Sequence, residues 1–214
     1  MTSCQGEPMK SFRLLACLAI GVLLPVSVDA QQSRPLSPRG EAATQVGGAY
    51  NGQGQYEGGS WIVVTYGRPL LRGRDLFGSG DAYGQAFLRG APNWRIGADQ
   101  STRFMTEVDL TFGGQRLPAG EYSIFAELSE GEWTLIFADW GVKDDFREDK
   151  PGALWGSYGY TPENDVLRTT MEVTTVGVAA DQLVIVFTDM TSAGGQFTVW
   201  WDDQVGSTAF QVAR

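Results

Sequence analysis

Arginine, glycine and aromatic residues are concentrated in one stretch of the sequence, Gly67–Ser101, which holds the side chains best suited to bind a polar ligand. Its 35 residues include seven glycines, five arginines and four aromatic residues, and they follow neither a helical nor a strand pattern. An arginine guanidinium is a planar fork that binds carboxylate or phosphate through two parallel bonds and stacks on aromatic rings. Glycine lets the backbone approach a ligand closely. The stretch therefore predicts a preorganised polar site for an anionic or polyhydroxyl ligand.

Two interpretations of these arginines are open, because a loop this long is uncommon in a compact domain unless it is functional. In the first, the arginines bind a ligand, and Asp99 orients one of them or accepts from a ligand hydroxyl. In the second, they tie the loop to the fold by donating to backbone carbonyls that lack a strand partner, and Asp99 pairs with an arginine. Both interpretations centre on the closing segment, Asn93–Thr102. The predicted ligand-binding residues are Arg68, Arg74, Trp94, Arg95, Asp99 and Thr102.

A second long loop, Trp140–Asn164, carries aromatic residues among glycines and prolines. Rings exposed at the rim of a β-sandwich stack on the faces of sugars, whereas buried rings would form a small core beneath the loop. Both possibilities are open for these residues, which are Trp140, Trp155, Tyr158 and Tyr160. The acidic residues between Asp139 and Asp149 lack the spacing of an EF-hand and are diluted by basic neighbours. A solvated acidic loop is therefore expected there, and no metal site is predicted.

The first thirty residues, Met1–Ala30, have the pattern of a secretory signal peptide, which is removed from the mature protein. Lys10 and Arg13 precede an uninterrupted apolar run of 11 residues, Leu14–Leu24. That run is shorter than the roughly 20 residues of a membrane-spanning helix. The end of the segment, Val28-Asp29-Ala30, supplies the small residues of a cleavage site. Translation from Met1 and from Met9 are both compatible with this pattern.

The predicted mature chain runs from residue 31 to residue 214 and is expected in the periplasm or outside the cell. Residues 31–40 are predicted to be a flexible linker, and residues 41–214 a single β-sandwich domain. The segment Leu14-Leu15-Ala16-Cys17 is similar to a lipobox, but cleavage there would leave an apolar run on the mature protein. A lipid anchor is therefore disfavoured.

Histidine is absent from the sequence, and both cysteines, Cys4 and Cys17, lie within the predicted signal peptide. Catalysis by Ser/His/Asp or Cys/His sets is therefore excluded, and neither an imidazole-ligated metal nor another cofactor is expected. Carboxylate chemistry, such as the paired acids of a glycosidase, remains open. Asp202 and Asp203 form one such pair, although neighbouring residues of a strand face opposite sides of a sheet.

The formal net charge of −9 is unevenly distributed along the chain. Residues 31–103 contain 8 basic and 5 acidic residues, a balance of +3, whereas residues 104–214 contain 6 basic and 18 acidic residues, a balance of −12. The arginine-rich loop is therefore the expected basic region of an acidic protein. Nucleic acid is excluded as a partner, because its binding depends on neutralising phosphates.

The rest of the sequence consists of short strand patterns separated by glycine-rich turns. Ser60–Tyr66 is β-branched and aromatic, which predicts a buried strand, and Thr102–Phe112 alternates apolar with polar residues as a half-buried strand does. Glu121–Leu128 and Glu132–Ala138 predict a hairpin. Further strands are expected at Glu41–Tyr50, Asp165–Val176, Gln182–Asp189, Gln196–Asp202 and Ser207–Val212. With no persuasive helical period, the chain is predicted to be all-β, an antiparallel β-sandwich or jelly-roll-like fold with about 8–9 strands and two long loops.

Four sequence blocks point to a known family. They are Tyr66-Gly67-Arg68-Pro69 with Arg72-Gly73-Arg74, then Trp94-Arg95-Ile96-Gly97-Ala98, then Leu117-Pro118-Ala119-Gly120-Glu121-Tyr122-Ser123, and last Asp165-Val166-Leu167-Arg168. In content and order they resemble the bacterial family catalogued as domain of unknown function 2911, over about residues 37–212. The resemblance implies an exported, β-rich protein and no particular activity.

Two departures from the family pattern are visible. The family usually follows Gly-Ala with Asn-Glu-Ala-Thr, whereas this chain has Asp99-Gln100-Ser101-Thr102, so any chemistry of that Asn-Glu pair is altered. The insert around Trp140–Tyr160 is also longer than in the usual family member.

The sequence as a whole favours a non-catalytic extracytoplasmic module that binds through the arginine-rich loop and the rim aromatics. Its expected partner is a polar or anionic small ligand, a glycan or an envelope protein. Two alternatives remain, a carbohydrate-active enzyme that uses only Asp and Glu, and a structural envelope protein without a small ligand. No transmembrane segment is expected after signal cleavage.

Overall fold

The computed structural model describes residues 35–213. The predicted signal peptide, both cysteines and the first residues of the predicted linker lie outside this range. Strand β1 (Arg39–Val46) begins inside the segment expected to be a linker. None of the helices within residues 35–213 has the length and apolar character needed to cross a membrane.

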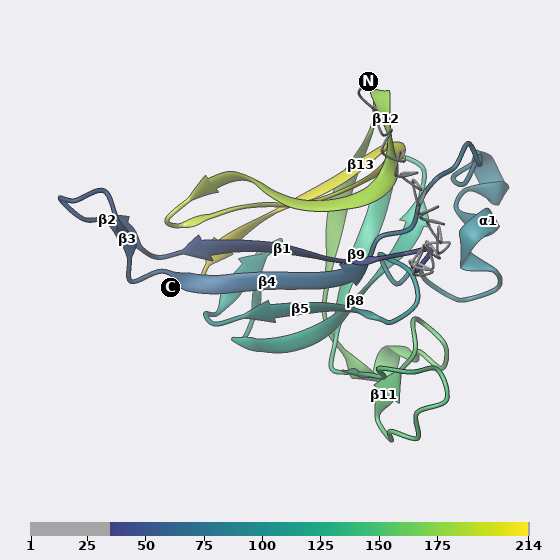
Figure 1. Ribbon diagram of the computed structural model, residues 1–214, viewed down its shortest axis with the longest axis horizontal. Coiled ribbons are helices and arrows are strands. Elements are labelled where there is room, and N and C mark those ends of the chain that lie inside the picture. The colour runs from purple at the N-terminus through teal and green to yellow at the C-terminus, as the bar shows by residue number, and fades with distance from the viewer. Residues whose placement is uncertain (1–34, 214) are drawn as a thin grey trace, which may run out of the picture. The chain divides into compact units, whose positions relative to one another are not determined.

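The predicted all-β, antiparallel architecture is confirmed (Figure 1). Nine strands form one antiparallel sheet in the order β1, β4, β5, β8, β9, β12, β13, β6, β7. Their bounds are β1 Arg39–Val46, β4 Ser60–Gly67, β5 Thr102–Thr106, β6 Leu110–Phe112, β7 Gln115–Leu117, β8 Gly120–Ser129, β9 Glu132–Ala138, β12 Asp165–Thr191 and β13 Gly194–Val212. Two small sheets pair β2 (Ala49–Tyr50) with β3 (Tyr56–Glu57), and β10 (Gly141–Val142) with β11 (Ala153–Leu154).

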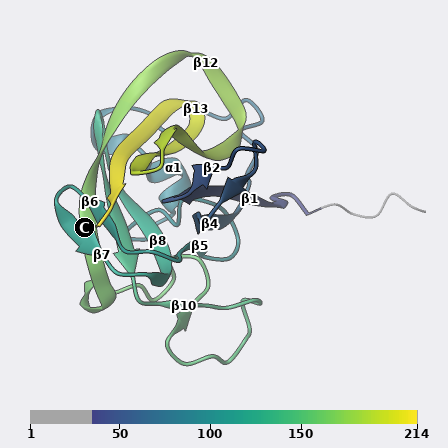
Figure 2. The same ribbon diagram turned by 90° about the vertical axis from the view of Figure 1, so that its left-hand side faces the viewer.

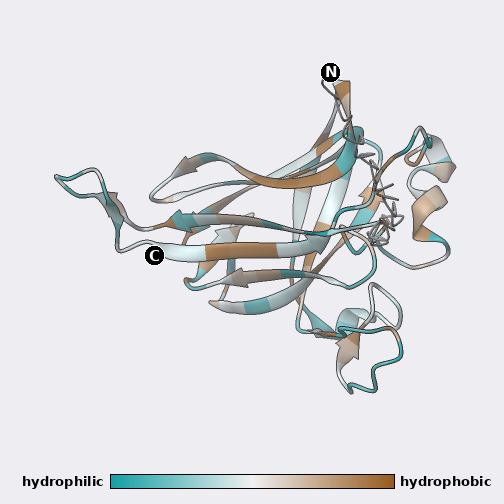
Figure 3. Cartoon of the chain, in the orientation of Figure 1, coloured by the Kyte–Doolittle hydropathy of each residue, from teal (hydrophilic) through white to brown (hydrophobic). Residues whose placement is uncertain are grey.

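The sheet curls over a shared core because its two longest strands turn back across it. Figures 1 and 2 show β12 and β13 arching over β1 and β4. The backbone N–H of Ile185 on β12 donates to the hydroxyl of Tyr66 on β4 over 2.9 Å, which joins the two layers. Figure 3 shows hydrophobic segments on β4 and β12. The fully buried rings of this core include Phe104, Phe112, Trp133, Phe137, Phe197 and Phe210.

One predicted strand, Thr102–Phe112, is divided into β5 and β6. The chain pairs with β4 and β8 up to Thr106, and from Leu110 it pairs with β13 and β7 at the other end of the sheet. The Thr106 hydroxyl donates to the carbonyl of Val108 over 2.6 Å, which stabilises the bend between the two strands. Apolar and polar residues continue to alternate across the bend, so the sequence pattern did not reveal that one strand ends and another begins there.

In contrast, four predicted strands merge into two. Asp165–Val176 and Gln182–Asp189 are both part of β12, and Gln196–Asp202 and Ser207–Val212 are both part of β13. The β12–β13 ladder contains register shifts between Thr175 and Val184, which let the long ribbon bend without ending. The predicted β8–β9 hairpin is present, with residue-by-residue pairing from Ser123↔Ala138 to Ser129↔Glu132.

Glycine at position 67 provides a test of how closely the arginine-rich loop packs on β4. A side chain at Gly67 would overlap the carbonyl oxygen of Ala98, whereas nothing lies near the corresponding position at Gly177. We expect Gly67→Ala to lower the free energy of unfolding by about 2 kcal/mol and the melting temperature by roughly 4–8 °C. The matched change Gly177→Ala should have little effect in the same urea and thermal melts. Equal effects of the two changes would contradict this packing.

Candidate functional site

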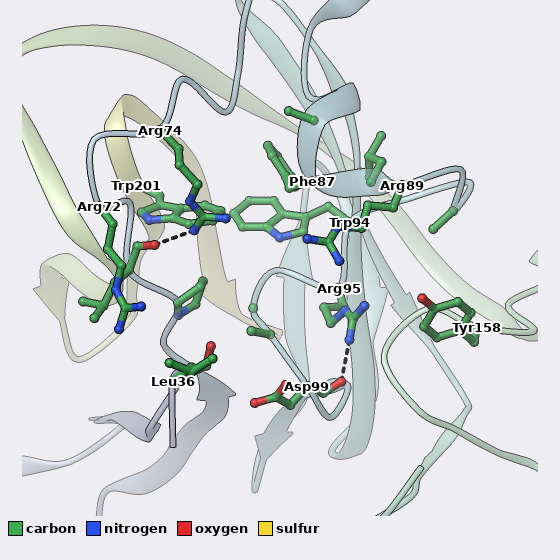
Figure 4. A pocket seen from close by; sticks show the side chains of 18 residues that line it. Leu36, Arg72, Arg74, Phe87, Arg89, Trp94, Arg95, Asp99, Tyr158 and Trp201 are labelled. Carbon is green, nitrogen blue, oxygen red and sulfur yellow. Dashed lines mark hydrogen bonds between the residues drawn. The ribbon is translucent and has the colours of Figure 1, made fainter. Parts of the chain in front are cut away.

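A cleft of about 610 Å³ lies where the Gly67–Ser101 loop meets the second long loop (Figure 4). The second loop contributes Tyr158, and β13 contributes Trp201. Its charged lining residues are Arg72, Arg74, Arg89, Arg95 and Asp99. The fold therefore gathers four of the five loop arginines and one of the four predicted rim aromatics around one hollow.

The Gly67–Ser101 loop is attached to the sheet at both ends. Near its start, the N–H of Leu71 donates to the carbonyl of Asp181 on β12 over 2.5 Å, and Leu183 donates to Pro69 over 3.0 Å. Near its end, Trp94 and Ala126 on β8 exchange two backbone hydrogen bonds of 2.8 and 2.7 Å. Between these points the loop contains two short helical turns that the sequence pattern did not indicate, the 3₁₀ helix Gly80–Ala82 and α1, Gln85–Leu88.

Trp94 is an anchor for the loop and is only 4% exposed. Its ring stacks on Trp201 with the ring centres 5.9 Å apart, and it meets Phe87 and Trp133 edge to face at 5.3 and 5.7 Å. Packed aromatic pairs of this kind contribute about 0.5–1.5 kcal/mol each beyond the burial of their area. Trp94 is thus part of the core, and it also forms one wall of the cleft, so its ligand-binding role stays a prediction.

The segment after Trp94 is a tight hook, held by two side chains that donate to its backbone carbonyls. Ile96 and Asp99 have positive φ angles of 47° and 63°, which are uncommon for residues other than glycine. The buried Thr102 hydroxyl donates to the carbonyl of Ile96 over 2.9 Å. Arg95 donates to the backbone carbonyl of Asp99 over 2.6 Å. Thr102 thus stabilises the hook, and Asp99 contacts Arg95 through its backbone instead of the expected carboxylate pairing.

The arginines of the loop are held to different degrees. Arg74 donates from Nε to the carbonyl of Leu71 over 2.9 Å and from a terminal nitrogen to Leu70 over 2.5 Å, so it ties the loop as the second interpretation expected. Arg68 does not line the cleft; its side chain packs against Gly40, and its buried Nε has no partner among the described residues.

Arg72 and Arg89 line the cleft, but neither guanidinium has a hydrogen-bond or salt-bridge partner within residues 35–213. Both residues are exposed and hold positive φ angles, of 53° and 50°. Each precedes a glycine that also has positive φ, Gly73 or Gly90. Neither arginine was among the predicted site residues. The sequence signal that could have identified them is the Arg-Gly pair, which occurs at both positions.

Positive charge in the cleft is poorly compensated. Four arginines face one aspartate there, and the salt bridges of the described residues all involve other side chains. Burial lowers the pKa of the Arg95 guanidinium, and the nearby charge of Arg89 lowers it further, whereas Tyr158 and Asp99 act in the opposite direction. An anion in the cleft would stabilise these charges.

The predicted rim aromatics separate into two groups. Tyr158 is 59% exposed, and the guanidinium carbon of Arg95 lies 5.8 Å from its ring centre. Trp155 is half-buried nearby. Trp140 and Tyr160 instead pack against a small second core of Phe125, Ile136, Ala138 and Leu154. The Tyr160 hydroxyl donates to the Asp165 carboxylate over 2.8 Å. The stacking interpretation thus remains available for Tyr158 and Trp155 alone.

Acidic residues elsewhere do not assemble into a comparable site. Within residues 35–213, no group of three or more His, Cys, Asp or Glu side chains is placed to hold a metal. Asp202 and Asp203 lie outside the lining of the cleft. Burial raises the pKa of the Asp202 carboxyl, and the neighbouring Asp203 raises it further.

Comparison with known proteins identifies a family. The family model described as "Protein of unknown function (DUF2911)" matches residues 51–210, which is most of the chain. No curated protein and no solved structure matches the chain.

The two kinds of cleft arginine should differ in their effect on stability. Arg74→Met removes two hydrogen bonds to loop carbonyls, so it should lower the free energy of unfolding by about 1–2 kcal/mol. Arg72→Gly relieves a left-handed backbone and should leave stability unchanged or raise it by about 1 kcal/mol. Urea unfolding of the two variants measures this difference. A loss at Arg72 as large as that at Arg74 would show that both are structural.

The raised pKa of Asp202 has a defined consequence for the pH dependence of stability. A carboxyl with a raised folded-state pKa favours folding most when it is protonated, and this contribution falls as pH rises through that pKa. Asp202→Asn should therefore stabilise the protein at pH 7, with the gain shrinking at pH below about 4. Asp109→Asn is the opposite control: hydrogen bonding to Arg116 lowers the Asp109 pKa, so this change should destabilise at pH 7. Urea unfolding at pH 7 and at a pH below about 4 measures both changes. A lower free energy of unfolding for Asp202→Asn than for the wild type at pH 7 would contradict the prediction.

Proposed function

The chain belongs to the DUF2911 family, and we propose that it is an exported, non-catalytic binding module that holds a small anionic ligand in the arginine-lined cleft. The proposal rests mainly on one observation. Arg72 and Arg89 present their charges to the cleft without a partner in the described part of the chain, while their neighbours Arg74 and Arg95 are held by backbone carbonyls. A guanidinium free to form two parallel bonds suits a carboxylate or phosphate group.

The backbone and the side chains of Arg72 and Arg89 have different roles. The left-handed conformation of Arg89 ends helix α1, and the backbone N–H of Arg72 donates to the Asp181 carboxylate over 2.8 Å. Neither side chain forms a protein hydrogen bond in residues 35–213. Unpaired guanidinium groups on a backbone held in this way favour a ligand-binding role over a purely structural one.

Binding is also favoured over hydrolysis at this cleft. A glycosidase of the common type needs two carboxyl groups on either side of the scissile bond, about 5–9.5 Å apart. Asp99 is the one acidic side chain among the lining residues. The carboxylate pair of Asp202 and Asp203 does not line the cleft, so the arginines and that pair do not form one site.

The export step is proposed from the sequence of Met1–Ala30. In a bacterial host, the N-terminal sequence of the periplasmic protein should begin at Gln31. Retention of the uncleaved chain in the cytoplasm would contradict the proposal for localisation and would leave the cleft chemistry unaffected.

A thermal-shift screen of the predicted mature chain, residues 31–214, tests the binding function. We expect at least one of phosphate, a dicarboxylate or a sugar acid to stabilise the protein, by about 2.7 kcal/mol at 100 times its dissociation constant, or roughly 5–10 °C. Arg89→Gln should abolish this shift. Arg116→Gln is the matched control, because it removes the same charge from an exposed position on β7, outside the cleft. Stabilisation of the Arg89 variant equal to that of the wild type would refute the site.

A further inference from the structure

An exposed aromatic strip continues from the cleft onto the second long loop. Phe146 and Tyr158 are 62% and 59% exposed, and Trp155 is half-buried. The ring of Phe146 lies 6.3 Å from that of Tyr158 and 6.5 Å from that of Trp155, measured between ring centres. Clustered exposed rings on a soluble domain indicate an interaction surface.

The strip is fixed in place by hydrogen bonds. The buried Ser101 hydroxyl lies 2.6 Å from the carbonyl of Gly156 and 3.3 Å from that of Leu154, so the two long loops are joined directly beneath the rings. Lys150 donates from Nζ to the carbonyl of Val142 over 2.8 Å, which closes the base of the loop. A preorganised surface loses less conformational entropy on binding than a mobile one.

The strip and the cleft form one continuous surface at Tyr158. This residue lines the cleft, and its ring lies beside Arg95 (Figure 4). Charge is distributed asymmetrically along this surface. The cleft end carries four arginines against Asp99. The Phe146 end has nearly balanced charge, because its flanking residues are four acidic ones, Asp144, Asp145, Glu148 and Asp149, and three basic ones, Lys143, Arg147 and Lys150. An elongated ligand would therefore place its anionic group in the cleft and an uncharged part over the rings.

We infer that the ligand is an acidic oligosaccharide, with the carboxylate of one sugar held in the cleft at Arg72 and Arg89 and a neighbouring sugar ring stacked on Tyr158 and Phe146. Aromatic side chains combine an apolar face with adjacent polar groups, which suits a sugar ring that has an apolar face and hydroxyls at its edge. The arginine fork supplies recognition of the carboxylate. This inference rests on the proposed anion-binding function and adds the class of ligand.

Isothermal titration with three probes tests the inference: an acidic disaccharide of one glucuronate linked to one glucose, glucuronate itself and a neutral glucose disaccharide. We expect the acidic disaccharide to bind more tightly than its monosaccharide, and the neutral disaccharide to bind at least tenfold more weakly than the acidic one. Phe146→Ala should weaken the acidic disaccharide about fivefold and leave the monosaccharide unchanged. Because Phe146 is largely exposed, this variant should fold normally. Tyr50→Ala, at an even more exposed ring on β2, is the matched control.

The outcomes separate this inference from the proposed function. If phosphate or a dicarboxylate binds in an Arg89-dependent manner while the acidic disaccharide does not, the module stands and the glycan assignment is wrong. The same conclusion follows if Phe146→Ala has no effect on the disaccharide, or if the neutral disaccharide binds equally well. If no anion binds at all, both proposals fail.

Discussion

The attachment of Trp94 to the sheet is the interaction on which the rest of the site depends. Its backbone forms a two-hydrogen-bond bridge with Ala126, and its ring is enclosed by Phe87, Trp133 and Trp201. The loop that precedes it is attached to β12 near its start through Leu71 and Pro69, and Trp94 fixes its other end on β8. The strained hook that follows then directs Arg95 towards the second loop.

The cleft arginines differ in their hydrogen-bond partners. Arg74 and Arg95 donate to loop carbonyls and so maintain the shape of the cleft, whereas Arg72 and Arg89 have no comparable partner in residues 35–213. The charge of Arg89 lowers the pKa of the Arg95 guanidinium, so these like charges oppose each other in the cleft, and a bound anion would offset this effect. Stability and ligand binding are therefore expected to depend on different arginines of the same loop.

Much of the fold could be predicted from sequence because it depends on local periodicity. The strand at Ser60–Tyr66, expected from its β-branched and aromatic residues, and the β8–β9 hairpin were predicted correctly. Several predicted site residues line the cleft, namely Arg74, Trp94, Arg95, Asp99 and Tyr158. Arg72 and Arg89 were not among the predicted residues, because the contacts that place them are not local. The path of the loop is set partly by pairing of Leu71 with Asp181, which is far away in sequence. No periodic pattern encodes such a contact, nor the bulges that merge four predicted strands into β12 and β13.

The most direct test of this account is an NMR titration that observes the Nε–H groups of ¹⁵N-labelled arginines while a sugar acid or phosphate is added. The account predicts that the signals of Arg72 and Arg89 move with a common dissociation constant. The signal of Arg74, whose Nε–H donates to Leu71, should remain nearly fixed. Unchanged signals at Arg72 and Arg89 under saturating ligand, or an equal response at Arg74, would contradict the division between structural and ligand-binding arginines.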